Sequence, residues 1–146
     1  MKKLLLTLTL FLLSTTAQAL DPCMTGSWYD PEQSGFGVNI EAHDVYTASY
    51  LYTFDGDSRP VWYVMLGDKI LTMSVAYVLD DDDFITKEVE VGVAEIIPIT
   101  DGVIRFRYSL IAEVDPDGGG VRICRGDHCD GDYIFKQLTR PLECEK

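Results

Sequence analysis

The sequence from Val45 to Phe54 reads VYTASYLYTF, and large or apolar side chains largely alternate there with small polar ones. Alternation with a period of two is typical of a β-strand, because successive side chains of a strand point to opposite faces. One face carries Tyr46, Ala48, Tyr50, Tyr52 and Phe54, and the other carries Thr47, Ser49 and Thr53. We predict that the tyrosine face is buried and that the threonine face is mostly hydrated.

The segments beside this strand continue the β pattern. Residues 35–42 alternate again, and the short connection His43-Asp44 predicts that they form an antiparallel hairpin with residues 45–54. The apolar side of residues 35–42 carries Phe36, Val38, Ile40 and Ala42. After a turn over residues 55–60, residues 61–66 are apolar at almost every position, which is typical of a central strand.

Further strands are predicted at residues 70–79, 85–93, 94–99, 103–110 and 132–139. The side chains expected to share one face of each strand are Leu71, Met73, Val75, Tyr77 and Leu79, then Val89, Val91 and Val93, and then Ile104, Phe106, Tyr108 and Leu110. No segment keeps an apolar stripe of helical period over three turns, so no long helix is expected. The predicted fold class is all-β: a single antiparallel meander of about seven to nine short strands, arranged as a barrel or a two-sheet sandwich.

The first 19 residues are typical of a secretory signal peptide. They begin with MKK, continue with an apolar stretch from Leu4 to Leu13, and end in AQA, whose small residues suit a signal peptidase. This apolar stretch is shorter than the about 20 residues that span a bilayer. We therefore predict a signal peptide at residues 1–19, a single β domain at residues 20–146, no membrane insertion after signal removal, and a periplasmic or extracellular location.

The charge of the chain excludes some partners. The chain has 24 acidic and 12 basic residues, and its net charge of −12 becomes −14 when Lys2 and Lys3 leave with the signal peptide. A field of this sign repels phosphate backbones and anionic lipids. We expect no nucleic acid partner, and we expect the acidity to aid solubility outside the cytoplasm.

All four cysteines lie after residue 19, and an even number of cysteines in an exported protein predicts disulfides. Three pairings are possible. The pairing we favour joins Cys124 to Cys129 across a short loop and Cys23 to Cys144 across nearly the whole domain. The alternative is a metal site of Cys124, His128 and Cys129, but export favours oxidation and the sequence offers no evident fourth ligand, so no metal and no cofactor are expected.

Two blocks of the sequence resemble a family of exported bacterial proteins of unknown activity. Residues 26–39 read GSWYDPEQSGFGVN, and residues 52–55 and 59–63 read YTFD and RPVWY, similar to that family's G-x-W-[WY]-[ND]-P-x-x-S-G-[WF]-G … Y-x-[YF]-D … R-P-x-W-Y pattern. Weaker similarity follows at residues 91–94, 106–108 and 136–140. The chain departs from the pattern at Ser58, where a glycine is usual, and in the cysteine-bearing insertion around residues 124–129. The resemblance implies an exported β structure and no activity.

Aromatic residues concentrate in these two blocks and are the candidates for ligand binding. The candidates are Trp28, Tyr29, Phe36, Asn39, Arg59, Trp62 and Tyr63. Packing of aromatic rings over glycines such as Gly35 and Gly37 is the structural interpretation. The functional interpretation is a surface or cavity on which rings stack against a ligand. We predict an exported, non-enzymatic binding or interaction domain for a small ligand, a glycan or a protein.

Two other functions stay open, and no catalytic residue is assigned. A small envelope hydrolase would use a carboxylate pair from Asp30, Glu32, Asp55 and Asp57. A protein-facing inhibitor would use the loop from Asp115 to Cys129, stiffened by its own disulfide. The acidic stretches at residues 80–83 and 115–132 offer oxygen ligands for calcium but lack the spacing of an EF-hand, so solvated loops are expected there.

Overall fold

The structure is a computed structural model that describes residues 20–54, 58–78, 86–115, 120–141 and 144. The predicted signal peptide, the acidic stretch at residues 80–83 and the aspartates at positions 55 and 57 lie outside the described residues. Within the part of the chain that the structure describes, no helix has the length and apolarity that crossing a bilayer requires.

The described residues form strands joined by turns, with two short 3₁₀-helices. The strands are β1 (Gly26–Tyr29), β2 (Gly37–Ala42), β3 (Thr47–Phe54), β4 (Pro60–Gly67), β5 (Ile70–Val78), β6 (Thr86–Thr100), β7 (Val103–Leu110), β8 (Ala112–Asp115), β9 (Gly120–Ile123) and β10 (Asp130–Gln137). The 3₁₀-helices are η1 (Pro22–Met24) and η2 (Asp127–Cys129).

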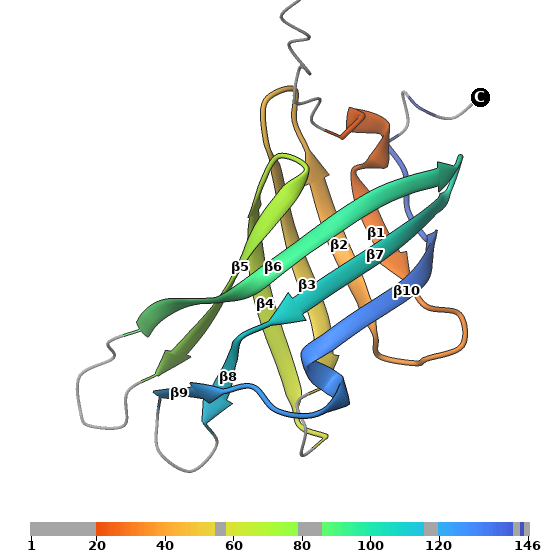
Figure 1. The fold of residues 1–146 in the computed structure, drawn as a ribbon. Helices are drawn as coiled ribbons and strands as arrows, with labels where there is room; N and C mark the ends of the chain where they lie inside the picture. Colours follow the sequence, from red (N-terminus) through yellow and green to blue (C-terminus); the bar gives the residue numbers. More distant parts are fainter. Residues whose placement is uncertain (1–19, 55–57, 79–85, 116–119, 142–143, 145–146) are drawn as a thin grey trace, which may run out of the picture.

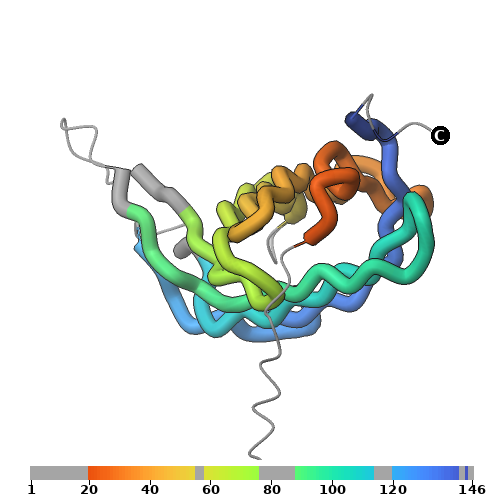
Figure 2. The backbone as a smooth tube through the Cα atoms, turned by 90° about the horizontal axis from the view of Figure 1, so that it is seen from above, coloured from red at the N-terminus to blue at the C-terminus, as the bar shows by residue number. Residues whose placement is uncertain are grey.

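Eight strands close into an antiparallel barrel in the order β1-β10-β7-β6-β5-β4-β3-β2 (Figure 1). Strands β8 and β9 form a separate two-stranded sheet between β7 and β10 in the chain. Seen from above, β2 to β4 make one wall and β6, β7 and β10 make the opposite wall (Figure 2). The all-β prediction is confirmed, and of the two arrangements predicted the structure is the barrel. Closure of the sheet removes the free edges that a sandwich would leave.

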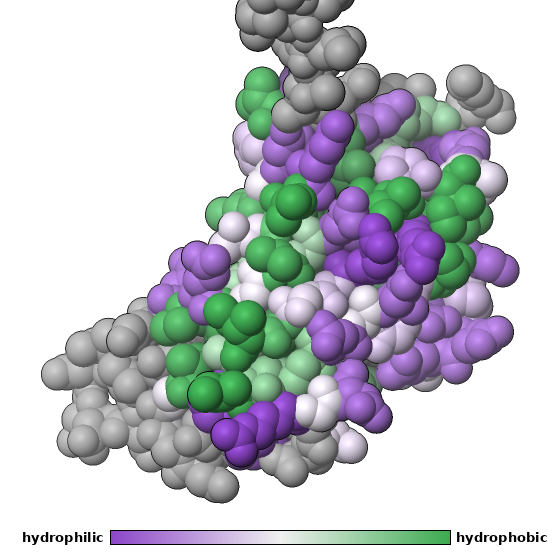
Figure 3. Space-filling model, viewed as in Figure 1, coloured by the Kyte–Doolittle hydropathy of each residue, from purple (hydrophilic) through white to green (hydrophobic). Residues whose placement is uncertain are grey.

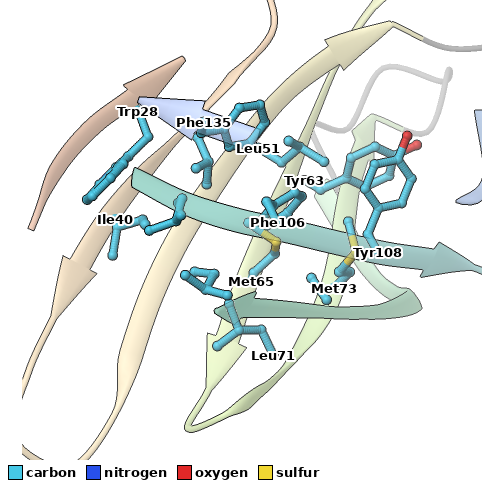
Figure 4. Packing of buried hydrophobic residues seen from close by; sticks show 14 of the residues in the cluster. Trp28, Ile40, Leu51, Tyr63, Met65, Leu71, Met73, Phe106, Tyr108 and Phe135 are labelled. Atoms are coloured by element: carbon cyan, nitrogen blue, oxygen red, sulfur yellow. The ribbon is translucent and has the colours of Figure 1, made fainter. Parts of the chain in front are cut away.

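The interior of the barrel is filled with side chains. Figure 4 shows Ile40, Met65, Phe106 and Phe135 converging from different strands, and all four are completely buried. The inward side chains predicted for β2, for residues 71–75 of β5 and for β7 are buried as expected. A protein interior packed in this way excludes water and stabilises the fold by apolar burial.

The prediction for β3 is wrong in one respect, because the tyrosine face points outward. Thr47, Ser49 and Leu51 are completely buried, whereas Tyr50 and Phe54 are exposed. The barrel interior already holds large side chains on the neighbouring strands, and Ser49 pairs across the sheet with Ile40 and Met65. The small side chain of Ser49 suits a position between these two neighbours, while the larger Leu51 shares the inward face, so this face is selected by packing volume as well as by polarity.

Strand β6 joins two predicted strands into one and contains a bulge. Met73 pairs with Gly92 and Ser74 pairs with Glu90, so Val91 is an extra residue on β6. The bulge shifts the alternation by one residue. Val91 is therefore buried as predicted, but Val93 is exposed, contrary to the prediction.

The two ends of the domain are fastened together. Cys23 and Cys144 form a disulfide with their Cα atoms 5.5 Å apart, and Cys124 and Cys129 form the second disulfide, so the favoured pairing is confirmed. Strand β1 pairs with β10 only at Trp28 and Tyr29. The first disulfide lies next to this short seam. Two disulfides fit a protein that matures outside the cytoplasm.

Charged side chains cover one outer wall. On the face shown in Figure 3, hydrophilic side chains gather over β7 and β10. Arg105 pairs with Asp132 and Arg107 pairs with Glu95, each at 2.5 Å. The hydrogen bond from Arg105 holds the pKa of Asp132 below its usual value. These pairs are solvent-exposed, so each contributes little to stability.

Candidate functional site

The structure separates the seven predicted ligand-binding residues between the inside and the outside of the barrel. Trp28, Phe36 and Tyr63 are buried, whereas Tyr29 and Trp62 are exposed. A single surface made of all seven residues is therefore excluded.

The inward aromatics are structural. The indole Nε1 of Trp28 donates a hydrogen bond of 2.9 Å to the backbone oxygen of Met24, which fixes η1 against the barrel. The ring of Phe36 contacts Tyr133 and Phe135 at centroid distances of 4.4 and 5.3 Å. Tyr63 is buried and lies in the same core (Figure 4). Aromatic packing, the structural interpretation, holds for these three residues.

The outward aromatics gather on the opposite side of the same strands. Register aligns Tyr29 with Gly37, Gly37 with Tyr52, and Tyr52 with Trp62 across β1 to β4. The rings of Tyr52 and Trp62 meet edge to face with centroids 4.7 Å apart, and Trp62 is 64% exposed. We call this set the outer aromatic strip; its members are Tyr29, Tyr50, Tyr52, Phe54 and Trp62.

Two glycines of the strip allow neighbouring atoms to approach closely: a Cβ atom at Gly37 would lie only 2.5 Å from the backbone oxygen of Trp28. Gly37 lies between Tyr29 and Tyr52 in the register, so no side chain separates them. Gly35 has a φ of 81°, and a Cβ atom there would lie 3.3 Å from the ring of Phe54. At Gly35 an aromatic ring therefore lies over bare backbone, as predicted from the sequence, whereas Gly37 is buried and lets the backbone of β1 approach closely.

Polar groups border the strip. Asn39 pairs with Tyr50 in the register, and its Oδ1 accepts a hydrogen bond of 3.3 Å from Ser27 Oγ. Lys136 lies across the seam from Tyr29. Arg59 is exposed and follows Ser58, whose φ of 62° lies in the left-handed region that favours glycine. The strip therefore combines uncharged rings with polar contacts at its margins.

The carboxylates proposed for a hydrolase have an ordinary structural role where they are described. Asp30 Oδ1 accepts a hydrogen bond of 2.8 Å from the backbone N–H of Glu32, which is typical of a turn. Asp55 and Asp57 lie outside the described residues.

An open cleft of about 590 Å³ lies between η1, the β6–β7 turn and the end of β10. Its apolar lining includes Met24, Trp28 and Ile96. Two of its carboxylates are ion-paired, since Glu95 contacts Arg107 and Asp101 contacts Arg140. Sequence reasoning did not identify this cleft because it forms where segments distant in the chain meet.

A second polar cluster surrounds the Cys124–Cys129 disulfide. His128 Nε2 lies 2.6 Å from Glu113 Oε2, and Arg122 Nε lies 3.0 Å from Glu113 Oε1. Glu113, an acidic residue, is only 3% exposed. No sequence signal identified Glu113, because its partners come from β9 and η2 and are brought to it by the fold. Residues 116–119 of the loop proposed for an inhibitor lie outside the described residues.

No protein-family model matches the chain, and neither the curated proteins nor the solved structures contain a significant match.

Proposed function

We propose that this protein is an exported, non-enzymatic binding domain of the bacterial cell envelope, and that the outer aromatic strip holds its ligand. The ligand class that the strip favours is a neutral glycan. The observation that carries the proposal is the exposure of Trp62, which is 64% exposed while Tyr52 braces its ring.

An exposed tryptophan of this kind needs a reason, because large apolar rings are normally buried when a fold can bury them. Here the interior is filled by other side chains, so a ligand contacts the outside of the barrel. Aromatic rings bind ligands through their flat faces, and the tyrosine hydroxyls of the strip add hydrogen-bonding groups.

The charge of the chain narrows the choice of ligand. The rings of the strip carry no charge, and the net charge, which is −12 for the full chain and −14 without Lys2 and Lys3, repels anionic polymers. A neutral glycan offers flat apolar faces and hydroxyl groups without this repulsion. The signal-like residues 1–19 and the two disulfides support an envelope location, with the periplasm as the proposed compartment.

The chain has only two tryptophans, which makes a direct test possible. In a Trp28→Phe variant, Trp62 is the only tryptophan, and its fluorescence reports on the strip. We expect titration with soluble neutral oligosaccharides to change the emission of this variant. Trp62→Ala should abolish retention of the protein on immobilised neutral polysaccharide.

The control is Ile123→Ala, which removes an exposed apolar side chain from β9, outside the barrel sheet. This variant should bind as the wild type does. Unchanged retention of Trp62→Ala, or equal loss in Ile123→Ala, would contradict the proposal.

A further inference from the structure

The polar cluster at the Cys124–Cys129 disulfide brings four metal-ligating groups to one place. Glu113 comes from β8, Cys124 follows β9, and His128 and Cys129 belong to η2. The donor atoms of Cys124, His128 and Cys129 all lie within 4.8 Å of one another. Glu113 completes the set, since its Oε2 lies 2.6 Å from His128 Nε2.

His128 is the common neighbour of the other three groups. Its Nε2 lies 3.6 Å from Cys124 Sγ and 3.9 Å from Cys129 Sγ. In a tetrahedral zinc site with bonds of about 2.3 Å to sulfur and about 2.0 Å to nitrogen, the sulfur and nitrogen atoms lie about 3.5 Å apart. The imidazole is therefore already placed near the position that a zinc ligand would take.

We propose that this cluster is a redox-controlled zinc site: when the Cys124–Cys129 disulfide is reduced, the two cysteines bind Zn²⁺ together with His128 and Glu113. In the oxidised protein the sulfur atoms are bonded to each other and provide no thiolate, so the site does not form.

The chemistry balances with a thiol reductant. An external dithiol transfers two electrons and two protons to the disulfide and becomes a disulfide itself, which leaves Cys124 and Cys129 as thiols. Zinc binding then displaces the two thiol protons, and His128 coordinates as the neutral imidazole. When zinc leaves, the two thiolates regain their protons. Exchange with an external disulfide, which takes up two electrons and two protons and becomes a dithiol, then re-forms the Cys124–Cys129 bond.

The charge and burial of the cluster suit a cation. Glu113 is 3% exposed, and burial of a carboxylate is costly unless a cation pairs with it. Two thiolates and one carboxylate around Zn²⁺ leave one net negative charge. Arg122 contacts the other oxygen of Glu113, Oε1, and would balance this charge from outside the ligand shell.

The backbone segments that carry the ligands are already held in position. Glu113 and Arg122 are register partners of the β8–β9 sheet. The hydroxyl of Tyr108 on β7 donates a hydrogen bond of 3.1 Å to the backbone oxygen of His128, which ties η2 to the barrel. Metal binding therefore requires the two sulfur atoms to part and the Glu113 carboxylate to shift, while the backbone on both sides is held.

The test uses the full mature protein with Co²⁺ as the probe, because Co²⁺ replaces zinc in tetrahedral sites and absorbs visible light. After reduction under anaerobic conditions, we expect one Co²⁺ per chain and a thiolate-to-cobalt absorption band. The oxidised protein should show neither. Zinc should displace the cobalt and remove the band.

Three variants identify the ligands. Cys124→Ser/Cys129→Ser keeps the Cys23–Cys144 pair and should bind no cobalt after reduction, which excludes the other cysteines. His128→Ala and Glu113→Gln should each weaken cobalt binding by about 10-fold or more. His43→Ala is the matched control, since His43 is the only other histidine, and should bind as the wild type does.

A measurement on the wild type guards against variants that fail to fold. If His128 is a ligand, the cobalt-loaded protein shows one strongly shifted, exchangeable imidazole proton by NMR, and His43→Ala retains this signal. Equal binding by oxidised and reduced protein would overturn the proposal. So would an absence of cobalt uptake, or an unshifted imidazole together with wild-type affinity in His128→Ala, which would indicate a dithiol acting alone.

Discussion

Trp28 and Trp62 belong to similar aromatic pairs in the sequence and have opposite surroundings in the fold. Trp28 is 3% exposed and anchors η1, whereas Trp62 lies on the outside. Trp28→Ala should lower the free energy of unfolding by about 3–5 kcal/mol, because it opens a cavity in the core. Trp62→Ala should change it by less than about 1 kcal/mol. Urea denaturation of both variants measures the difference, and equal losses would contradict these assignments.

The buried hydroxyl of Tyr108 should make the free energy of unfolding depend on pH. Burial raises the pKa of its hydroxyl well above the usual value, and Tyr133 nearby adds to the shift. Between the normal pKa of about 10 and the raised one, the unfolded chain loses this proton and the folded protein keeps it, so stability falls as the pH rises. Below about pH 10 the hydroxyl of Tyr108 keeps its proton in both states, so its contribution to stability is fully present.

Tyr108→Phe removes this contribution and the hydrogen bond to His128. At pH 8 the variant should be less stable by about 1 kcal/mol, because one hydrogen bond is lost. Between about pH 10 and pH 11 its stability should fall less steeply than that of the wild type. Urea midpoints at several pH values measure both effects, with the exposed Tyr46→Phe as control. An identical alkaline slope in the wild type and Tyr108→Phe would show that the prediction is wrong.

At the scale of the elements, strand β3 shows where the sequence pattern was sufficient and where it was not. Its alternation predicted a strand with two distinct faces, and this is confirmed. The pattern did not reveal which face is inward, because tyrosine suits both a core and an exposed sheet. The inward face depends on packing against neighbouring strands, as at Ser49, which lies between Ile40 and Met65.

The buried face of β3 leads to a stability prediction. Thr47 is completely buried, and its Oγ1 has no hydrogen-bond partner among the described residues. A buried hydroxyl without a partner costs free energy, and valine has nearly the same shape. Thr47→Val should therefore raise the free energy of unfolding by about 1 kcal/mol.

The matched control for Thr47→Val is Thr72→Val on β5, where the side chain is exposed. This control separates the loss of a buried hydroxyl from the strand preference of valine. Chemical denaturation checks both variants. A destabilised Thr47→Val would mean that its hydroxyl has a partner that compensates for its burial.

Strand β6 shows a second limit of pattern reading. The valines before and after Gly92 follow one period in the sequence, but the bulge at Val91 reverses their phase. A bulge depends on pairing with the neighbouring strand and leaves only a weak local signal. The alternation of β7, which has no such interruption within its pairing to β10, was predicted correctly.

At the scale of the whole molecule, the disulfides differ in what they constrain. Cys23–Cys144 spans 121 residues of sequence and Cys124–Cys129 spans 5. In the loop-entropy description, the long loop contributes about 5 kcal/mol to stability and the short loop about 2 kcal/mol. Cys23→Ser/Cys144→Ser should therefore be the less stable double variant. Calorimetry of the two variants measures the difference, and the opposite order would contradict this account.

Local patterns predicted the longer strands, the disulfide partners and the aromatic blocks, but they missed the short strands β1, β8 and β9. The closed barrel and its sites depend on distant contacts. The cleft beside η1 forms where Met24, Ile96 and Gln137 meet. Glu113 on β8 contacts His128, which lies 15 residues further along the chain, beyond β9. Such contacts join residues far apart in sequence, so neither composition nor spacing predicts them.

The central claim is that the barrel interior is filled and that the exposed aromatic strip lies on its outside. Acrylamide quenching of fluorescence in two single-tryptophan variants tests this claim most directly. Trp28→Phe, which keeps Trp62, should be quenched several-fold more strongly than Trp62→Phe, which keeps Trp28. Equal quenching, or stronger quenching of Trp28, would contradict the claim.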